Sequence, residues 1–323
     1  MARPEPAWVP APRNGVAASR VVAGAGGGGD VLGFLRARFP AVAAEWPARL
    51  ARGDVLGANG QPLQAGSACP PGLLLWYWRS PPPELRVPFE IVLLHQDAHL
   101  LVVDKPHFLA VTPGGRHLQE TVLLRLRQQL GLPSLVPLHR LDRETAGVLM
   151  LSLQPASRDA YCRLLRCHLV HKVYEAIAPW RADLALPMVC RSRLQNADGA
   201  AFMQALSVPG PPNAETLVEL IARLPATPDL AHDLAHDLAH YRLTPRTGRR
   251  HQLRVQLNQL GLPIVGDRIY PRLWPEPPAG SAPDFHQPLQ LLARELAFVD
   301  PLSGVPRRFT SQRRLLLAVP AGQ

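Results

Sequence analysis

The stretch that decides the fold of this chain is His139–Leu151, with the sequence HRLDRETAGVLML. Its first half is a charged loop in which Asp142 lies between Arg140 and Arg143, and its second half opens the apolar run Gly147–Leu153. A short, unbroken apolar run of this kind is typical of a buried β-strand. Catalytic groups often lie in loops that a rigid scaffold positions, so the pattern singles out Asp142.

Asp142 alone supports two interpretations. An adjacent arginine would hold the carboxylate ionised, and an ionised carboxylate can act as a nucleophile or as a base. The same arginine could instead form a structural ion pair that only orders the loop. Local chemistry by itself favours the structural ion pair, so the decision depends on other parts of the chain.

Strands and helices are mixed along the chain on both sides of this stretch. The predicted strands do not alternate strictly with helices, which indicates an α+β fold and argues against a doubly wound parallel sheet. By apolar runs and helical periodicity, we expect strands at Leu73–Trp78, Ile91–Leu94, Leu100–Val103, Gly147–Leu153, Val173–Ala178, Thr216–Leu224, Tyr241–Thr244, Leu289–Phe298 and Arg314–Val319, and helices at Val31–Phe39, Ala41–Arg52, Thr121–Leu130, Ser157–Cys167 and Arg249–Leu260.

Composition divides the chain into four parts. Residues 1–29 are rich in proline and end in a glycine run, so we expect them to be disordered. Residues 30–79 predict a small domain, residues 80–88 a proline-rich linker, and residues 89–323 one larger domain. The run Gly24–Gly29 matches the glycine pattern of dinucleotide-binding loops, but it lacks the strand that should precede it. It therefore predicts a linker and no nucleotide cofactor.

The small domain predicted at residues 30–79 combines two short helices with a hairpin. In this order it resembles the alpha-L RNA-binding domain that often precedes RNA-modifying domains. The alternative is a helical cap that binds nothing, because its helices carry only four arginines, Arg36, Arg38, Arg49 and Arg52.

Composition also limits the class of partner. The formal net charge is +10, and all basic residues except Lys105 and Lys172 are arginine. Arginine binds phosphate and stacks on bases, which favours a polyanionic partner. No apolar run reaches the length of a membrane span, and the first residues lack the apolar core of a secretory signal. We expect a cytoplasmic protein that binds no membrane, with four reduced cysteines that lack metal or redox spacing.

Three further segments carry polar residues that suggest a site. They are Val103–Pro106 at a strand end, Lys172–Ala176 on a strand, and the arginine-rich Arg246–Val255. Alternation along a strand places Lys172 and Tyr174 on the same face. The arginines of the third segment lie near a predicted helix N-terminus, where backbone N–H groups favour anions.

Together these motifs resemble the RluA family of pseudouridine synthases. HRLDRETAGVLML resembles that family's active-site motif, and RTGRRHQLRVQLNQLGLPIVGDRIY, Arg246–Tyr270, resembles its C-terminal motif. Lys105–Pro106 and Lys172–Tyr174 match two more family elements in the same order, and the resemblance spans Glu84–Val319. It implies an α+β fold with a mixed, mainly antiparallel central sheet flanked by helices, preceded by the alpha-L-like domain.

The resemblance also implies roles for particular residues and reverses the preference on Asp142. Asp142 corresponds to the essential aspartate, Tyr174 to the tyrosine that packs on the uracil and is a candidate base, and Arg254 to the arginine that pairs with the aspartate. Arg140 corresponds to the arginine that helps displace the target base, and Leu253 to an apolar residue lining the pocket. The other residues predicted to bind substrate are Lys105, Arg249 and Arg250.

The implied activity is isomerisation of a uridine in ribosomal or transfer RNA, by a monomer that needs no metal or organic cofactor. This sequence departs from the family pattern at Ala146, at His107–Phe108 and at Gln256, but none of these positions has an assigned chemical role. One alternative is a catalytically silent RNA-binding protein of the same fold. Another is a glycosidase or nucleosidase, although classical glycosidases need two carboxylates flanking the bond.

A low-complexity segment, Asp229–His240, repeats the tetrapeptide Asp-Leu-Ala-His three times. In a helix, His232, His236 and His240 would share one face, and histidines at that spacing can bind zinc or nickel. The other interpretation is an enlarged loop at the tip of a hairpin formed by the two neighbouring strands. We favour the loop.

Overall fold

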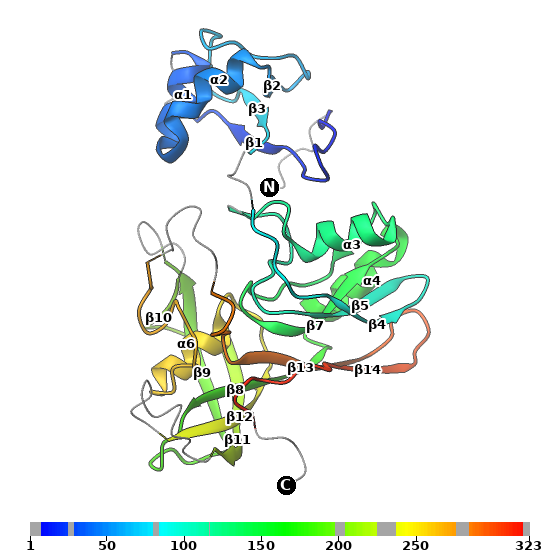
Figure 1. Ribbon diagram of the computed structural model, residues 1–323, viewed down its shortest axis with the longest axis vertical. Helices are drawn as coiled ribbons and strands as arrows, with labels where there is room; N and C mark the ends of the chain where they lie inside the picture. Colours follow the sequence, from blue (N-terminus) through cyan, green and yellow to red (C-terminus); the bar gives the residue numbers. More distant parts are fainter. Residues whose placement is uncertain are drawn as a thin grey trace. The chain divides into compact units, whose positions relative to one another are not determined.

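The computed structural model describes most of the chain, which divides into two compact units (Figure 1). The small unit comprises Met1–Glu84 and Gly115–Gln119, and the large unit comprises Leu85–Gly114 and Glu120–Gln323. The described residues are 8–24, 29–79, 84–115, 117–197, 204–224, 237–275 and 284–318.

The first helix of the small unit begins at a capping residue. In α1 (Val31–Arg38) the Asp30 carboxylate accepts the Gly33 N–H at 2.6 Å, the usual bond of an N-cap. The second predicted helix is split into a 3-10 turn, η1 (Pro40–Glu45), and α2 (Trp46–Ala51). The split follows from the prolines, because each one is tolerated only in the first turn of a helix.

Three strands complete the small unit in the order β1 (Ser19–Val22), β3 (Leu74–Tyr77), β2 (Val55–Gly57), all antiparallel. The predicted disorder of residues 1–29 is therefore wrong for β1, whose Val21 packs on the core of the unit. Overall composition concealed this short run, which gains its stability from pairing with β3 rather than from local propensity. Residues 1–7 and 25–28 lie outside the described residues.

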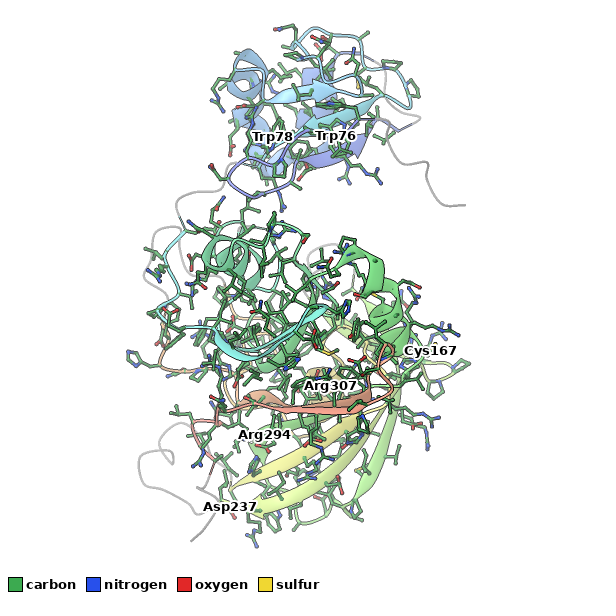
Figure 2. All side chains as sticks on the ribbon, turned by 90° about the vertical axis from the view of Figure 1, so that its right-hand side faces the viewer. Trp76, Trp78, Cys167, Asp237, Arg294 and Arg307 are labelled. Atoms are coloured by element: carbon green, nitrogen blue, oxygen red, sulfur yellow. The ribbon has the colours of Figure 1, made fainter. Side chains whose placement is uncertain are left out.

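The chain before β1 also packs on this sheet. The Arg13 guanidinium lies 3.7 Å from the ring centroid of Trp78 and forms an ion pair with Asp54. Trp78 and Trp76, both labelled in Figure 2, are less than a tenth exposed. The alpha-L resemblance of this unit stays a prediction.

The large unit is built on one sheet of eleven strands in its described part, in the order β10-β9-β11-β12-β8-β13-β7-β5-β4, with β14 on β13 and β6 on β7. Every pairing is antiparallel except β13 with β7, which confirms the predicted mixed, mainly antiparallel sheet. The strands are β4 (Val92–Gln96), β5 (Leu100–Lys105), β6 (Val136–Pro137), β7 (Ala146–Ser152), β8 (His171–Pro179), β9 (Met188–Asn196), β10 (Ala205–Val208), β11 (Ala214–Arg223), β12 (Leu238–Pro245), β13 (Leu291–Val299) and β14 (Pro306–Thr310).

Among the described residues, three helices pack on this sheet: α3 (Val122–Leu130), α4 (Pro155–Arg166) and α6 (Gln252–Gln259) (Figure 1). Successive residues of β5 contact different helices: Leu101 shares a core cluster with α3, whereas Val102 shares one with α4. Since successive residues of a strand face opposite ways, α3 and α4 cover opposite faces of the β5–β7 region. Helix α6 packs on the strands of the other half, from β8 to β11.

The parallel contact of β13 with β7 fixes where the charged loop enters the sheet. Gly147 in β7 has φ +115°, and a Cβ there would lie 2.2 Å from the carbonyl oxygen of Ala293 in β13. Only glycine fits so close an approach of two backbones. The loop that holds Asp142 therefore ends at a rigid point between the two halves of the sheet.

Two sequence predictions need correction at element boundaries. No strand forms at residues 314–318, because Leu315 is buried in irregular structure and the last strand is β14 instead. The predicted linker at residues 80–88 is too long. Val87 is buried in the large unit and its N–H donates to the Glu120 carboxylate at 2.9 Å, while residues 80–83 lie outside the described residues.

The tetrapeptide repeat lies mostly outside the described residues, which resume at Asp237. Strands β11 and β12 form the predicted hairpin. The third copy, however, is part of strand β12 rather than of a loop, and His240 approaches the Glu175 carboxylate at 3.2 Å. His232 and His236 lie outside the described residues. Within the described ranges, no three His, Cys, Asp or Glu residues are placed to hold a metal ion, and no helix is long and apolar enough to cross a membrane.

Candidate active site

The Asp142 loop is held by hydrogen bonds on both sides. The Thr145 N–H donates to the Asp142 carbonyl at 3.1 Å, which closes a turn just before β7. Ahead of the loop, the partly buried His139 ring accepts the Met150 N–H through Nε2 at 3.1 Å. Burial lowers the pKa of His139 to about 3, so the ring is neutral at pH 7 and can accept this bond. The carboxylate therefore projects from an ordered turn.

Lys105 holds the same loop through a hydrogen bond to the backbone of Arg143. Its ammonium is fully buried and donates to three carbonyl oxygens, those of Pro106, Leu109 and Arg143, at 2.8–3.0 Å. All three ammonium protons are thus engaged by the backbone. Burial lowers the pKa of Lys105 to about 7, while the nearby Glu144 and Asp142 carboxylates oppose that shift. The prediction that Lys105 binds substrate is wrong, because its charged group is enclosed by the protein.

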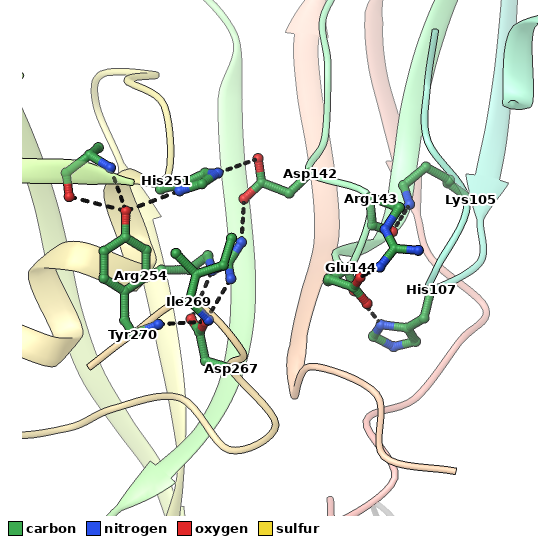
Figure 3. Close-up of polar contacts among 11 residues, drawn as sticks. Lys105, His107, Asp142, Arg143, Glu144, His251, Arg254, Asp267, Ile269 and Tyr270 are labelled. Carbon is green, nitrogen blue, oxygen red and sulfur yellow. Dashed lines mark hydrogen bonds and ion pairs between the residues drawn. The ribbon is translucent and has the colours of Figure 1, made fainter. Parts of the chain in front are cut away.

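Arg254 on α6 lies between two carboxylates (Figure 3). Its Nη1 donates to Asp142 Oδ2 at 3.2 Å, so the predicted pairing is present. Its Nε and Nη2 donate to the two oxygens of Asp267 at 2.8 and 2.6 Å. Because Asp267 is 1% exposed and Asp142 is 30% exposed, Asp267 fixes the guanidinium and Asp142 presents its carboxylate to the solvent.

The surroundings keep Asp142 ionised. Burial alone would raise the pKa of this carboxyl group, but His251, Arg254 and Lys105 lower it further than burial raises it. The net pKa is below the ordinary value for an aspartate, so the group is a carboxylate at neutral pH. An ionised carboxylate that remains partly exposed can react with a ligand.

Tyr174 extends from β8 towards the same region and packs against the two cores that meet there. Burial raises the pKa of its hydroxyl well above the ordinary value, and the negative charge of Asp142 raises it further. The hydroxyl is therefore protonated at neutral pH. Its ring supplies an apolar wall beside the carboxylate.

These groups line a cleft of about 690 Å³ in the large unit. Arg140, Arg249 and Arg250 are exposed along it, and Lys172 joins them from β8. Such a concentration of cations favours an anionic ligand. All the predicted site residues except Lys105 line this cleft, namely Asp142, Tyr174, Arg254, Arg140, Leu253, Arg249 and Arg250.

Comparison with known proteins identifies the family. Residues 99–259 match the family described as RNA pseudouridylate synthase. An RNA pseudouridine synthase of Synechocystis, itself uncharacterised, is 36% identical over 212 residues, which are 65% of this chain and 66% of that protein. The dual-specificity RNA pseudouridine synthase RluA of Haemophilus influenzae is 30% identical over 227 residues, 68% of this chain and 92% of that one. The chain belongs to the RluA family of RNA pseudouridine synthases.

Membership makes the chain an isomerase that acts on RNA. A solved structure, human RNA pseudouridylate synthase domain containing 1, shares the fold with a TM-score of 0.53 and 21% identity. That similarity covers 69% of this chain and 84% of the human one. The match to the family ends at residue 259. It therefore does not include Asp267, whose carboxylate accepts hydrogen bonds from Arg254 in this synthase.

Sequence reasoning assigned no role to three residues of the synthase's site. Lys172 could have been found, because the strand alternation already placed it on the face of Tyr174. His251 lies inside the C-terminal motif, 3.8 Å from Asp142, and Asp267 lies near its end. Nothing local distinguishes His251 or Asp267 from their neighbours, since their contacts are with residues far away in the chain.

Proposed function

We propose that this synthase isomerises a uridine of ribosomal or transfer RNA, with Asp142 as its catalytic carboxylate. The observation that carries the proposal is the state of Asp142. It is ionised, partly exposed and held by Arg254 at the wall of a cleft whose charged side chains are mostly cationic. RNA supplies the anionic ligand that such a cleft favours, and the family supplies the reaction.

The first step is access to the target base. A uracil stacked in folded RNA must leave the stack, which costs on the order of a few kcal/mol and less in a loop or at a mismatch. Arg249 and Arg250 are exposed at the cleft and can bind phosphates, which offsets that cost. Arg140 is exposed beside Asp142 and can occupy the space that the base vacates.

The second step is cleavage of the bond between ribose C1′ and uracil N1. Asp142 can attack the sugar, add to the base, or assist elimination from the ribose, and its depressed pKa keeps it charged for each route. Arg254 holds Oδ2 and stabilises that charge. Leu253 and the Tyr174 ring line the pocket in which the detached uracil turns.

The third step is attachment through C5 and loss of the C5 proton. Asp142 accepts that proton, or Tyr174 accepts it after its own hydroxyl proton has passed to solvent. The charge of Asp142 is one of the two causes that raise the pKa of Tyr174. A covalent bond between Asp142 and the substrate would remove that charge, and the phenol would then become easier to deprotonate. The sum of the steps is an isomerisation, so no co-substrate is required. We expect the synthase to act without a cofactor, as a monomer in the cytoplasm.

We further propose that the small unit assists RNA binding. Arg36 and Arg38 form the last turn of α1 and are exposed, and Arg20 is exposed on β1. Exposed arginines on a separate unit add phosphate contacts without touching the reaction. Replacing all three by glutamine should weaken RNA binding in a filter assay and leave the single-turnover rate at saturating synthase unchanged. Unaltered RNA binding would instead favour the alternative that the small unit is a cap that binds nothing.

The test of the main proposal is pseudouridine mapping of total RNA from cells with and without this synthase. We expect one or more uridines to be modified only when it is present, and to remain unmodified when Asp142→Asn replaces it. Identical maps would favour the alternative of a catalytically silent RNA-binding protein. Release of free uracil from RNA by the purified protein would instead indicate a nucleosidase.

A further inference from the structure

His251 is the cleft residue whose surroundings the proposed mechanism leaves unexplained. It is the N-cap of α6, and its backbone adopts the left-handed conformation with φ +53°. Its ring is 8% exposed. Nε2 lies 3.8 Å from Asp142 Oδ1, and Nδ1 lies 3.0 Å from the Tyr270 hydroxyl oxygen. Figure 3 shows His251 and Arg254 approaching Asp142 together, each backed by a second residue.

The two oxygens of the Asp142 carboxylate face different donors. Arg254 holds Oδ2, whereas His251 is directed at Oδ1. One donor leaves a carboxylate able to turn about its Cβ–Cγ bond, and a second donor on the other oxygen fixes its plane. The 3.8 Å separation is longer than a hydrogen bond, but catalytic hydrogen bonds often tighten only once substrate is bound.

The Tyr270 hydroxyl limits His251 to two arrangements of its ring proton. The Tyr270 hydroxyl accepts the Ala205 N–H at 2.6 Å and has a single proton, which can go to the Ala205 carbonyl at 3.1 Å or to His251 Nδ1. In the first case Nδ1 must carry the imidazole proton, and a bare Nε2 lone pair faces the Asp142 anion. In the second case Nε2–H points at that anion. The charge of Asp142 favours the second arrangement.

We propose that His251 is a positioning residue for Asp142, held by the Tyr270 hydroxyl in the tautomer that carries its proton on Nε2. The proposal rests on the proposed function, in which Asp142 reacts. Burial lowers the pKa of His251 to about 4, against the opposing effect of Asp142. The imidazole is therefore neutral at pH 7 and acts on Asp142 as an N–H dipole rather than as a charge.

Two substitutions at His251 distinguish two roles for this residue. Its side chain can position Asp142, or the residue can matter only because it adopts the left-handed backbone conformation. The amide nitrogen of glutamine reaches the place of Nε2, whereas the amide of asparagine is shorter and reaches only the place of Nδ1. Asparagine, in contrast, tolerates the left-handed backbone better than glutamine does. Positioning therefore predicts that His251→Gln is faster than His251→Asn, and a purely conformational role predicts the reverse order.

The assay uses the full-length synthase and, as probe, total RNA labelled with [5-³H]uridine in cells that lack this synthase. Pseudouridine formation releases tritium from C5, so the single-turnover rate is read from tritium in water. We expect His251→Asn to lose roughly tenfold or more in rate, the scale of one hydrogen bond to a charged group, with RNA binding unchanged. His251→Gln should keep most of the rate. Equal rates for the two variants, or a faster His251→Asn, would overturn the proposal.

A second measurement reads the tautomer of His251 directly. In the wild-type synthase labelled with ¹⁵N-histidine, the ring nitrogen shifts of His251 report its tautomer, with His251→Gln used to assign the signals. We expect the proton on Nε2, and a proton on Nδ1 would contradict the proposal.

Asp142→Asn is the control for the proposed function. If that variant stays active, the function assigned to Asp142 fails. If Asp142→Asn is inactive while both His251 variants are fully active, only the role of His251 is rejected.

Discussion

Asp142→Asn should abolish tritium release while lowering the melting temperature of the synthase only slightly. Asp142 is 30% exposed and its shortest contact, to Arg254 Nη1, is 3.2 Å. Ion pairs exposed to this extent contribute about 0–1 kcal/mol to the free energy of unfolding. Asparagine has nearly the same volume, and Arg254 keeps its bidentate bond to Asp267. The loss of activity has a different cause, since an amide is a poor nucleophile and accepts no proton at neutral pH.

Asp267→Asn is the matched comparison, because Asp267 binds the same guanidinium from a buried position. Its side chain is 1% exposed, and one of its oxygens also accepts the Ile269 and Tyr270 N–H groups at 2.8 and 3.0 Å. Removing one partner of a buried ion pair costs about 3–5 kcal/mol. The amide oxygen can keep some of these bonds, so we expect the free energy of unfolding to fall by about 3 kcal/mol, the lower end of that range.

Thermal unfolding at pH 7 should therefore separate the two carboxylates. A loss of 1 kcal/mol lowers the melting temperature by roughly 2–4 °C in a unit of this size, so Asp267→Asn should melt roughly 6–12 °C lower and Asp142→Asn less than about 4 °C lower. Tritium release from labelled total RNA gives the activities in parallel. A large drop in melting temperature for Asp142→Asn, with activity retained, would show that Asp142 is only a structural ion pair.

Four further predictions follow from single contacts. Tyr174→Phe should lower the rate by about 10²-fold or more with an unchanged melting temperature, the scale of a lost general base, and an unchanged rate would limit Tyr174 to ring packing. Lys105→Met should lower the melting temperature without weakening RNA binding in a filter assay, because it leaves three backbone carbonyl oxygens without their donor. The pKa of Glu175 is lowered to about 2: burial raises it, but His240 and Arg294 lower it more. The stability that this depressed pKa contributes is present above about pH 4.5 and is lost as the pH falls towards 2, so Glu175→Gln should show a flatter acid limb in a series of melting temperatures. Deletion of residues 229–236 should leave tritium release intact, since it spares β12, and a loss of activity together with bound metal would instead favour the metal hypothesis.

Much of the fold was readable from local patterns. The apolar run after Asp142 is β7, and Asp30 and Thr121 accept the capping bonds of α1 and α3. Periodicity and capping depend on neighbours within a few residues, so they are encoded locally. Where a prediction failed, a distant contact decided the outcome: β1 forms because β3 lies beside it, and α6 begins three residues later than predicted, after the left-handed His251.

The sequence by itself determined the chemical inventory of the site, through the order of its motifs: Asp142, Tyr174, Arg140 and the arginines before α6. Only the tertiary structure decided how these groups are used. Asp142 and Arg254 are 112 residues apart, and they meet because the path of the sheet carries α6 back to the β7 loop. The same path enclosed Lys105, whose charge had indicated a substrate contact. Charge and motif position are properties of single residues, whereas burial and partnership depend on what the rest of the chain places around them.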